Sequence, residues 1–172
     1  MPLNYPLNWS MKFVADEMLG KLARWLRLAG HDVVYIGKLK LPPKRQDEKI
    51  LEILSNEGGV LLTGDVALYK HAAKSGLKSI LIRETEIARQ LVEISKLLGE
   101  RIEIVPENSR CPICNGSLTP IEKSAVKNTI PEKVLIANDS FWRCNGCNKI
   151  YWKGKHWENI IETVKQYENM MK

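Results

Sequence analysis

Two aspartates follow apolar segments that each have the composition of a buried strand. Asp16 comes directly after residues 12–15, and Asp65 follows residues 60–63 with one glycine between. If both strands lie in one parallel sheet, their carboxyl ends meet at the same edge, which is where open α/β sheets bind ligands. Carboxylate oxygens select Mg²⁺ or Mn²⁺ rather than zinc. We therefore expect a divalent-cation site at that edge of the sheet.

A third aspartate, Asp47, lies between these two in the chain, at the predicted start of a helix. An acid at this place can simply cap the free backbone N–H groups and favour the helix dipole. It can also belong to the same acidic site as the other two aspartates. Both roles are open from the sequence.

The four cysteines of the chain come as two Cys-x-x-Cys pairs. Cys111 and Cys114 form the first pair, and Cys144 and Cys147 form the second. Two such knuckles are the usual source of four thiolates for a tetrahedral zinc ion, and a site of this kind is structural because no ligand position stays open. A redox Cys-x-x-Cys motif is the alternative, although redox motifs rarely occur as a matched pair. We expect Gly146 to take the positive φ angle of the second knuckle.

Hydrophobic periodicity predicts that strands and helices alternate along the first two thirds of the chain. In the helix over residues 17–29, Met18, Leu22, Leu26 and Ala29 form one apolar stripe. Alternation of this kind predicts a parallel sheet with helices on both faces. The expected strands are 12–15, 33–36, 60–63, 79–82 and 102–105, and the expected helices are 17–29, 47–55, 66–74 and 86–98.

Three parts of the chain differ in composition. Residues 1–10 show no periodicity and read as a flexible arm or as an alternative start before Met11. Residues 11–107 carry the α/β pattern. Residues 108–172 contain the cysteines, strand-like segments at 134–136 and 141–142, and a final helix predicted over 157–170, which together indicate a small zinc ribbon followed by a helix.

Basic residues lie close to the acids and after the second cysteine pair, and the net charge is +6. Such side chains can contact phosphates, and aromatic residues between them can stack on bases. The simpler alternatives are a solvated helix face, a plain surface loop at 38–45, and tryptophans that pack the ribbon onto the sheet. The candidate RNA contacts are Lys21, Arg24 and Arg27 in the first helix, Lys44 and Arg45 in the following loop, and Trp152, Lys155 and His156 after the second cysteine pair.

Apolar runs in the sequence stay well short of the roughly 20 residues that span a bilayer. The first residues also lack the basic and then apolar pattern of a secretory signal. We therefore expect a cytoplasmic protein without a membrane partner, and reduced cysteines that bind metal rather than form disulfides.

Several segments resemble the Mut-seven carboxy-terminal RNase family, a group of PIN-like nucleases. The resemblance covers nearly the whole chain after residue 11 and rests on residues 13–30, 60–65, 110–115 and 151–157. It implies an α/β fold with a PIN-like parallel sheet sandwiched by helices, followed by a small C-terminal zinc ribbon and a final helix. It also implies a ribonuclease that uses clustered aspartates to bind Mg or Mn.

Carried over by position, the resemblance assigns Asp16, Asp47 and Asp65 to the catalytic metal site. The family commonly has arginine where this chain has Gly64. PIN-like sites often use a fourth acid, for which the candidates here are Glu17, Glu48 and Glu84.

Three other functions are alternatives to metal-dependent RNA hydrolysis. A non-catalytic adapter could bind RNA, a ribosome or another ribonucleoprotein through the basic and aromatic surfaces, with a degenerate acidic site. A phosphoacceptor receiver domain would need a lysine at the end of the fifth predicted strand, where residues 104–107 supply none. A nucleotide-binding enzyme is disfavoured because no glycine-rich phosphate loop follows a strand.

Overall fold

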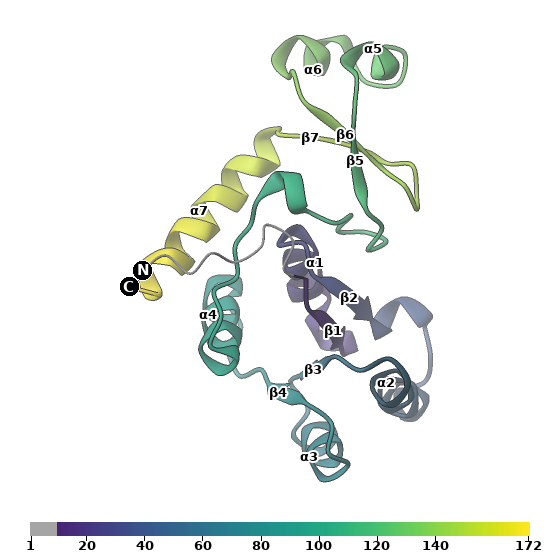
Figure 1. Cartoon of the computed structure of the whole chain (residues 1–172), viewed down its shortest axis with the longest axis vertical. Helices are drawn as coiled ribbons and strands as arrows, with labels where there is room; N and C mark the ends of the chain where they lie inside the picture. Colours follow the sequence, from purple (N-terminus) through teal and green to yellow (C-terminus); the bar gives the residue numbers. More distant parts are fainter. Residues whose placement is uncertain (1–9) are drawn as a thin grey trace.

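The computed structural model describes residues 10–172 and consists of a parallel sheet with its helices, a small antiparallel sheet, and a long final helix (Figure 1). The predicted arm over residues 1–10 lies outside the described residues except for Ser10, whose hydroxyl donates to the carbonyl of Gly30 at 3.1 Å.

The parallel sheet has four short strands in the order β2-β1-β3-β4. Neighbouring strands are all parallel, with Val14 opposite Val34 on one side and Leu61 on the other. Because β3 returns to the other side of β1, the order reverses between β1 and β3, which is the position where such sheets bind ligands. The strands are β1 (Lys12–Ala15), β2 (Asp32–Tyr35), β3 (Val60–Thr63) and β4 (Ser79–Leu81).

Helices cover both faces of this sheet. α1 (Gly20–Leu28), which follows the short 3-10 helix η1 (Glu17–Leu19), and α4 (Ile87–Leu98) pack on the face that carries Phe13. α2 (Pro43–Glu57) and α3 (Val66–Lys74) pack on the face that carries Val14. The α/β sandwich expected from the alternating pattern is therefore present, with both faces of its strands buried.

Three details of the first two thirds differ from the prediction. Residues 102–105 form no strand, so four strands make up the described parallel sheet instead of five. Met18 is 86% exposed because the chain turns through η1 before the apolar face of α1 begins, and only Leu22, Leu26 and Ala29 of the predicted stripe are buried. The second helix begins at Pro43 rather than Asp47, because proline at the first helical position needs no N–H partner.

The ribbon is a three-stranded antiparallel sheet in the order β5-β6-β7. Its strands are β5 (Leu118–Ile121), β6 (Phe141–Cys144) and β7 (Ile150–Trp152). The short helices α5 (Lys123–Val126) and α6 (Glu132–Ala137) lie between β5 and β6. The prediction of a strand at 134–136 was wrong. This segment belongs to α6, where Leu135 packs with Val126 and Phe141 in a small core.

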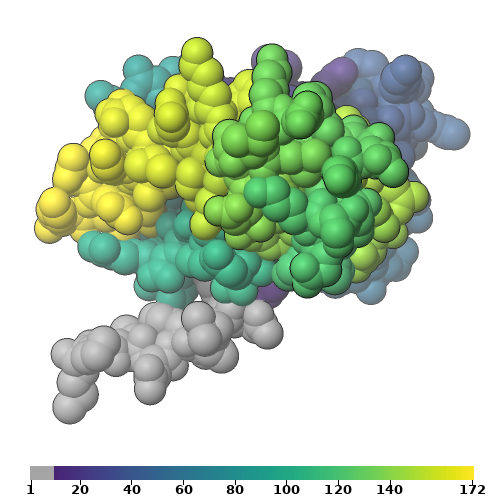
Figure 2. Space-filling view, turned by 90° about the horizontal axis from the view of Figure 1, so that it is seen from above, coloured from purple at the N-terminus to yellow at the C-terminus, as the bar shows by residue number. Residues whose placement is uncertain are grey.

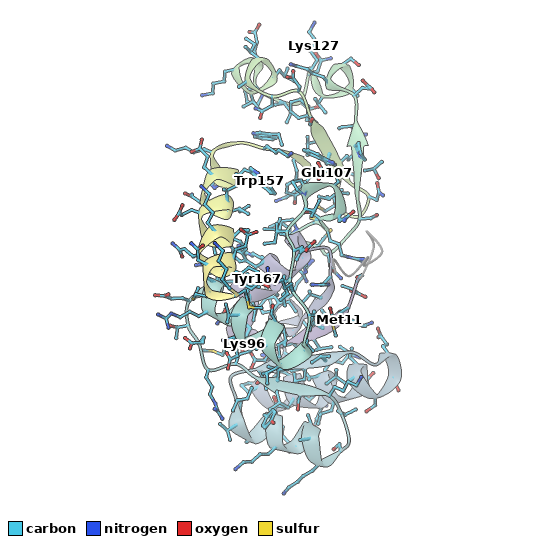
Figure 3. The ribbon with its side chains drawn as sticks, turned by 60° about the vertical axis from the view of Figure 1, so that its left-hand side comes forward. Met11, Lys96, Glu107, Lys127, Trp157 and Tyr167 are labelled. Carbon is cyan, nitrogen blue, oxygen red and sulfur yellow. The ribbon has the colours of Figure 1, made fainter. Side chains whose placement is uncertain are left out.

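The last helix, α7 (Lys155–Met170), begins two residues before its predicted start and returns to the first sheet. The buried side chain of Tyr167 packs in the core beneath α4, and its hydroxyl lies 2.9 Å from both Ser95 Oγ and the backbone N of Ile102. Trp157 and Tyr167 lie at different heights along α7 (Figure 3). In the space-filling view the yellow surface of α7 lies directly beside the green surface of the ribbon (Figure 2).

The segment before the first cysteine is fixed to the turn between α1 and β2. The 3-10 helix η3 (Pro106–Asn108) leads to Ser109, whose hydroxyl donates to the carbonyl of Leu28 at 2.6 Å. Gly30 in this turn has a φ of 86°, and a Cβ there would come within 2.7 Å of the Asn108 carbonyl oxygen. Only glycine allows this close approach. Among the described residues, no helix is long and apolar enough to cross a membrane.

Candidate functional site

Asp16 ends β1 at the point where the strand order reverses, and its side chain is held in place. The backbone N–H of Met18 donates to Oδ1 at 3.0 Å, and that of Gly64 donates to Oδ2 at 3.1 Å. The buried hydroxyl of Thr63 also donates to Oδ2. With 7% of its surface exposed, the Asp16 carboxylate has one rigid orientation at the carboxyl edge of the sheet.

Asp65 follows β3 at the same edge and caps α3. Its Oδ1 accepts hydrogen bonds from the backbone N–H groups of Ala67 at 2.6 Å and Leu68 at 3.0 Å. Its own N–H donates to Thr63 Oγ1 at 2.9 Å, so that Thr63 joins the two aspartates through one hydroxyl. The Asp65 side chain is exposed, and no partner of Oδ2 is found among the described residues.

Asp47 lies in the second turn of α2, one turn later than predicted, and therefore does not cap this helix. Its carboxylate is exposed and lies close enough to Asp65 and Asp16 to be affected by their charges. Partial burial raises the pKa of Asp47 above its usual range, and the charges of Asp65 and Asp16 raise it further, whereas His71 of α3 lowers it. Carboxylates that repel one another in this way are stabilised by a cation among them.

The structure thus brings the three predicted aspartates to one edge from β1, α2 and the start of α3. Their oxygens are more widely spaced than the sulfurs of the cysteines. Among residues 10–172, the cysteines alone form a group in which at least three candidate ligand atoms all lie within 4.8 Å of one another. The acidic site is therefore open, with one fixed carboxylate and two exposed ones.

The candidates for a fourth acid differ in position. Glu17 follows Asp16 and its Oε2 accepts a hydrogen bond from Gln46 Nε2 at 3.0 Å, which joins η1 to α2. Glu48 is exposed on α2 next to Asp47. Glu84 lies after β4, where its backbone contacts α4 through Gln90 at 2.8 Å. Glu17 is the candidate that the structure ties to the elements carrying the aspartates.

Of the basic residues predicted in the first helix, Lys21 and Arg24 are exposed on α1. Arg27 is only 5% exposed, and the prediction that it contacts RNA was wrong. Its guanidinium donates to the carbonyl of Val33 at 2.7 Å and to that of Pro112 at 3.0 Å. Arg27 thus joins α1, β2 and the first cysteine knuckle, which a spacing of three residues along a helix could not reveal.

The other predicted RNA contacts lie in two places. Lys44 and Arg45 are exposed in the first turn of α2 rather than in a loop, and Lys155 and His156 are exposed in the first turn of α7. Trp152 is half-buried and packs on Phe141 with ring centroids 6.5 Å apart, so it belongs to the small ribbon core. Trp152 therefore packs within the ribbon and does not join the ribbon to the parallel sheet.

The four cysteine sulfurs gather at one end of the ribbon. Sγ of Cys111 lies 3.7 Å from that of Cys147, and Sγ of Cys114 lies 3.3 Å from that of Cys144. The two knuckles repeat one backbone pattern, in which the N–H of Asn115 donates to Cys111 O at 2.9 Å and that of Asn148 donates to Cys144 O at 3.0 Å. Sulfurs of a tetrahedral zinc site are about 3.8 Å apart, so the arrangement suits zinc.

Glycine serves the knuckles in a different way from the one predicted. The positive φ angles belong to Asn115 at 69° and Asn148 at 60°, and Gly146 has none. A Cβ on Gly146 would lie 3.1 Å from Cys114 Sγ, and one on Gly116 would lie 2.9 Å from Cys144 Sγ. The glycines are therefore required because each knuckle approaches a sulfur of the other, and asparagine tolerates the left-handed turn.

The surroundings of the four thiols, including the neighbouring sulfurs, shift the pKa values of Cys111 and Cys114. Burial raises the pKa of Cys111, but hydrogen bonds from the Tyr151 hydroxyl and from backbone N–H groups lower it by more, to about 6. The pKa of Cys114 rises to about 12, first through burial and then through the neighbouring sulfurs. Four thiolates at this spacing need a cation to remain ionised together. The four cysteines could hold a zinc ion, whose role in a closed four-thiolate site is structural.

The positive charge of Arg27 lies beside this cluster. Burial lowers the pKa of its guanidinium, and the charges of Cys111 and Cys114 oppose that effect. Zinc with four thiolates carries two negative charges, so a buried arginine next to the knuckle reduces the cost of holding that charge within the protein.

Comparison with known protein families identifies the family of this chain. The family model described as Mut7-C RNAse domain matches residues 11–164. The chain belongs to this family. The match spans the acidic edge, the ribbon and most of α7, so a Mut7-C RNAse domain comprises both sheets together. Its name indicates a nuclease-like role with RNA as the substrate. No curated protein and no solved structure matches the chain.

Two residues near the aspartates of this Mut7-C RNAse domain were not singled out from the sequence. Thr63 shares its hydroxyl between Asp16 and Asp65, and its position as the last residue of β3, two before an aspartate, was the available signal. His71 reaches the charge of Asp47 from α3. Nothing in the sequence marks His71, because its proximity depends on α2 and α3 sharing one face of the sheet.

Proposed function

We propose that this Mut7-C RNAse domain is a metal-dependent ribonuclease that hydrolyses RNA phosphodiester bonds at the carboxyl edge of its parallel sheet. The proposal is supported above all by the convergence of Asp16, Asp47 and Asp65 at the point where the strand order reverses. Oxygen ligands from three separate elements suit Mg²⁺ or Mn²⁺. Such an ion, when bound, lowers the pKa of a water molecule and stabilises charge on the phosphate oxygens.

The acidic residues have different roles in the proposed metal site. Asp16 supplies a carboxylate whose orientation is fixed by Thr63 and by two backbone N–H groups. Asp47 and Asp65 are exposed, and Asp65 can offer its second oxygen to a cation while Oδ1 caps α3. Glu17 and Glu48 are the candidates for a fourth acid of the metal site. The Glu17 side chain is held by a hydrogen bond from Gln46.

Exposed cations flank the acids on both faces of the sheet. Lys21 and Arg24 extend from the start of α1 on one face, and Lys44 and Arg45 extend from the start of α2 on the other. Since α1 follows β1 and α2 follows β2, both helices begin near the carboxyl edge where Asp16 lies. We assign these four residues to the phosphates on either side of the cleaved bond.

The remaining parts of the proposal concern the ribbon. Residues 11–107 would form the catalytic unit and residues 108–172 the ribbon with its helix, in a cytoplasmic protein. The exposed Lys155 and His156 would extend the RNA surface toward the ribbon, and half-buried Trp152 would support them rather than stack on bases. The nuclease fold would be PIN-like, and zinc would have no part in the cleavage step.

The test is cleavage of a labelled single-stranded RNA with Mn²⁺, with chelator, and by aspartate variants. Asp16→Asn and Asp65→Asn should each reduce Mn²⁺-dependent cleavage by a factor of about 10² or more, because loss of one group that supports charge stabilisation in the transition state typically costs this much. Glu52→Gln is the matched control, because Glu52 is an exposed acid on α2 that forms an ion pair with Lys49. The control should cleave as the wild type does.

The adapter function is the alternative outcome of the same test. RNA that binds tightly but remains intact with Mn²⁺, and binds equally well to both aspartate variants, would contradict the ribonuclease. In that outcome the basic and aromatic surfaces would bind RNA or a ribonucleoprotein without hydrolysis.

A further inference from the structure

A groove of about 610 Å³ runs beside β4, away from the cysteine cluster. Its floor includes Ile80 and Leu81 of β4, and its two sides are formed by Tyr69 of α3 and by Leu97 of α4. The strand order places β4 at the outer edge of the parallel sheet, and no other strand of residues 10–172 pairs with its free side. The groove therefore follows an open sheet edge.

The backbone of β4 presents hydrogen-bonding groups to this groove. Leu61 donates to the carbonyl of Lys78, and Ile82 donates to that of Thr63, so residues 78, 80 and 82 turn toward β3. In a parallel pair, alternate residues bond on one side only. The N–H and C=O groups of Ser79 and Leu81 consequently point away from β3, into the groove.

The opposite edge of the same sheet is covered. There the N–H of Val33 in β2 donates to Asn115 Oδ1 at 3.0 Å, and its carbonyl accepts from Arg27. Proteins generally cover edge strands because unpaired edges bind other strands. One edge of this sheet is therefore closed by the cysteine knuckle, while the other is open and has a shaped groove.

The side chains of the groove combine an apolar floor with a basic rim. Leu97 is 64% exposed beside Leu81, which gives an extended chain an apolar surface to cover. Lys78, Arg83 and Lys96 surround this surface, and Lys96 is labelled on α4 in Figure 3. The acid of the groove, Glu93, already accepts the backbone N–H of Arg83 at 3.2 Å. The rim is thus positive and complements a negative partner.

From these observations we propose that the groove binds an extended acidic peptide segment of a partner protein, which adds to the sheet beside β4 as a fifth strand. Its backbone pairs with Ser79 and Leu81, its apolar side chains cover Leu97, and its acids meet Lys78 and Lys96. This mode of strand addition takes affinity from the main chain and specificity from alternate side chains. It is independent of the proposed ribonuclease activity, since it uses none of the three aspartates.

The experiment uses the full chain and a fluorescein-labelled peptide of on the order of eight residues, in which glutamate alternates with valine. Fluorescence anisotropy should show saturable binding that weakens as salt is added. Lys78→Glu combined with Lys96→Glu should weaken it by more than about tenfold, because like charges then meet. Ser79→Pro should do the same, since proline removes an outward N–H while the bonds to β3 remain.

Lys74→Glu is the matched control, because Lys74 is exposed at the end of α3 but does not line the groove. It should bind the peptide as the wild type does, and circular dichroism should show that all variants remain folded. A peptide in which lysine replaces glutamate should bind more weakly than the acidic peptide.

Four results would overturn the proposal. The first is no saturable binding of the acidic peptide, and the second is binding that Ser79→Pro leaves unchanged. The third is that the Lys78 and Lys96 changes reduce the affinity for single-stranded RNA more than that for the peptide, which would make the groove an RNA surface. The fourth is a dimer in sedimentation velocity that Ser79→Pro dissociates, which would make a second copy the occupant.

Discussion

Asp16 and Asp47 are chemically identical side chains in opposite surroundings. Asp16 is buried and accepts three hydrogen bonds, whereas Asp47 is exposed and is repelled by the other two acids. A buried acceptor with several donors stabilises the fold, and a charge among like charges does not. The same substitution at the two positions should therefore separate a structural contribution from a functional one.

We expect Asp16→Asn to lower the free energy of unfolding by about 1–3 kcal/mol, because an amide N–H₂ would face the donors of Thr63 and Gly64. Asp47→Asn should leave it unchanged or raise it slightly, because a repulsion is removed. Urea unfolding with chelator present measures both. Equal destabilisation by the two changes would contradict the distinction.

His31 should make the folding stability depend on pH, independently of the aspartates. It is 2% exposed, its Nδ1 accepts the N–H of Met11 at 3.2 Å, and burial lowers its pKa to about 4. Because the unfolded chain takes up a proton near pH 6.5 and the folded chain does not, stability is full above that pH and falls as the pH approaches 4. The loss reaches about 3 kcal/mol.

The comparison variant is His31→Asn, whose amide oxygen can replace Nδ1 as an acceptor and does not titrate. Urea unfolding between pH 7.5 and 4.5 should show a difference between wild type and variant that changes with pH. Other groups and any bound metal contribute equally to both proteins and cancel. A difference that stays constant over this range would argue against a buried neutral histidine.

The two cysteine knuckles act on the sheet as well as on each other. The first knuckle covers the β2 edge through Asn115, which accepts from the backbone N–H of Val33 at 3.0 Å and donates to Asp32 at 2.7 Å. The conformation of Asn115 in turn depends on Cys114 and Cys111. Metal in the cluster should therefore stabilise an edge of the parallel sheet.

If the cysteines hold zinc, its removal should reduce the hydrogen-exchange protection of the Val33 amide before that of Val14, which lies in the central strand β1 and is completely buried. Local opening at an edge costs less than opening of a central strand. Exchange measured by NMR with and without chelator tests this. Equal loss at both amides would mean that the knuckle supports the whole sheet rather than its edge.

Arg27 and Arg24 form a second matched pair, one turn apart on α1. Arg27→Met should lower the free energy of unfolding by about 2–4 kcal/mol, because the buried carbonyls of Val33 and Pro112 lose their donor. Arg24→Met should change stability by less than about 0.5 kcal/mol and should weaken RNA binding. Thermal unfolding and RNA titration measure the two effects. An RNA defect confined to Arg27→Met would restore its predicted role.

Elements that depend on local pattern could be predicted, and those that depend on distant contacts could not. The first four strands and the helix over 86–98 follow from apolar periodicity, and α4 ends at Leu98 with Gly99 as its C-cap. The segment at 134–136 has strand-forming residues, but Pro131 is the N-cap of α6, and Leu135 packs with Val126 and Phe141 in the ribbon core. The burial of Arg27 likewise depends on a knuckle that lies far along the chain.

The same limit applies to the site. Positions of Asp16 and Asp65 could be predicted because each ends a parallel strand, where geometry is shared along an edge. The approach of Asp47 depends on how α2 packs, and that of His71 depends on α3 as well. The cysteine cluster could be predicted from the spacing of the cysteines alone. The roles of Gly116 and Gly146 could not, because they depend on how closely the two knuckles approach each other in space.

At the scale of the whole molecule, α7 joins the end of the ribbon to the first sheet. Tyr167 is its buried contact, and its hydroxyl bonds both α4 and the segment after it. Tyr167→Phe keeps the packing but leaves Ser95 and the Ile102 N–H without this partner, which should cost about 1–3 kcal/mol.

Chemical unfolding would measure that loss, with Tyr69→Phe as the control because Tyr69 is half-buried at the groove, away from α7. If α7 is essential to the first sheet, the Tyr167 variant should also show a single transition at lower denaturant. A separate early transition of α7 alone, with the sheet unaffected, would contradict this.

The cover of the β2 edge has a consequence for biosynthesis. All four parallel strands leave the ribosome before Cys111, and the metal ligands are complete only after Cys147 has been translated. Domains tend to fold as they emerge, and exposed strand edges favour aggregation. If the cysteines bind zinc, the β2 edge of the nascent sheet therefore stays uncovered until the second knuckle emerges. The fraction of new chains with a covered β2 edge would then depend on the metal that the cysteines can bind while the chain is made.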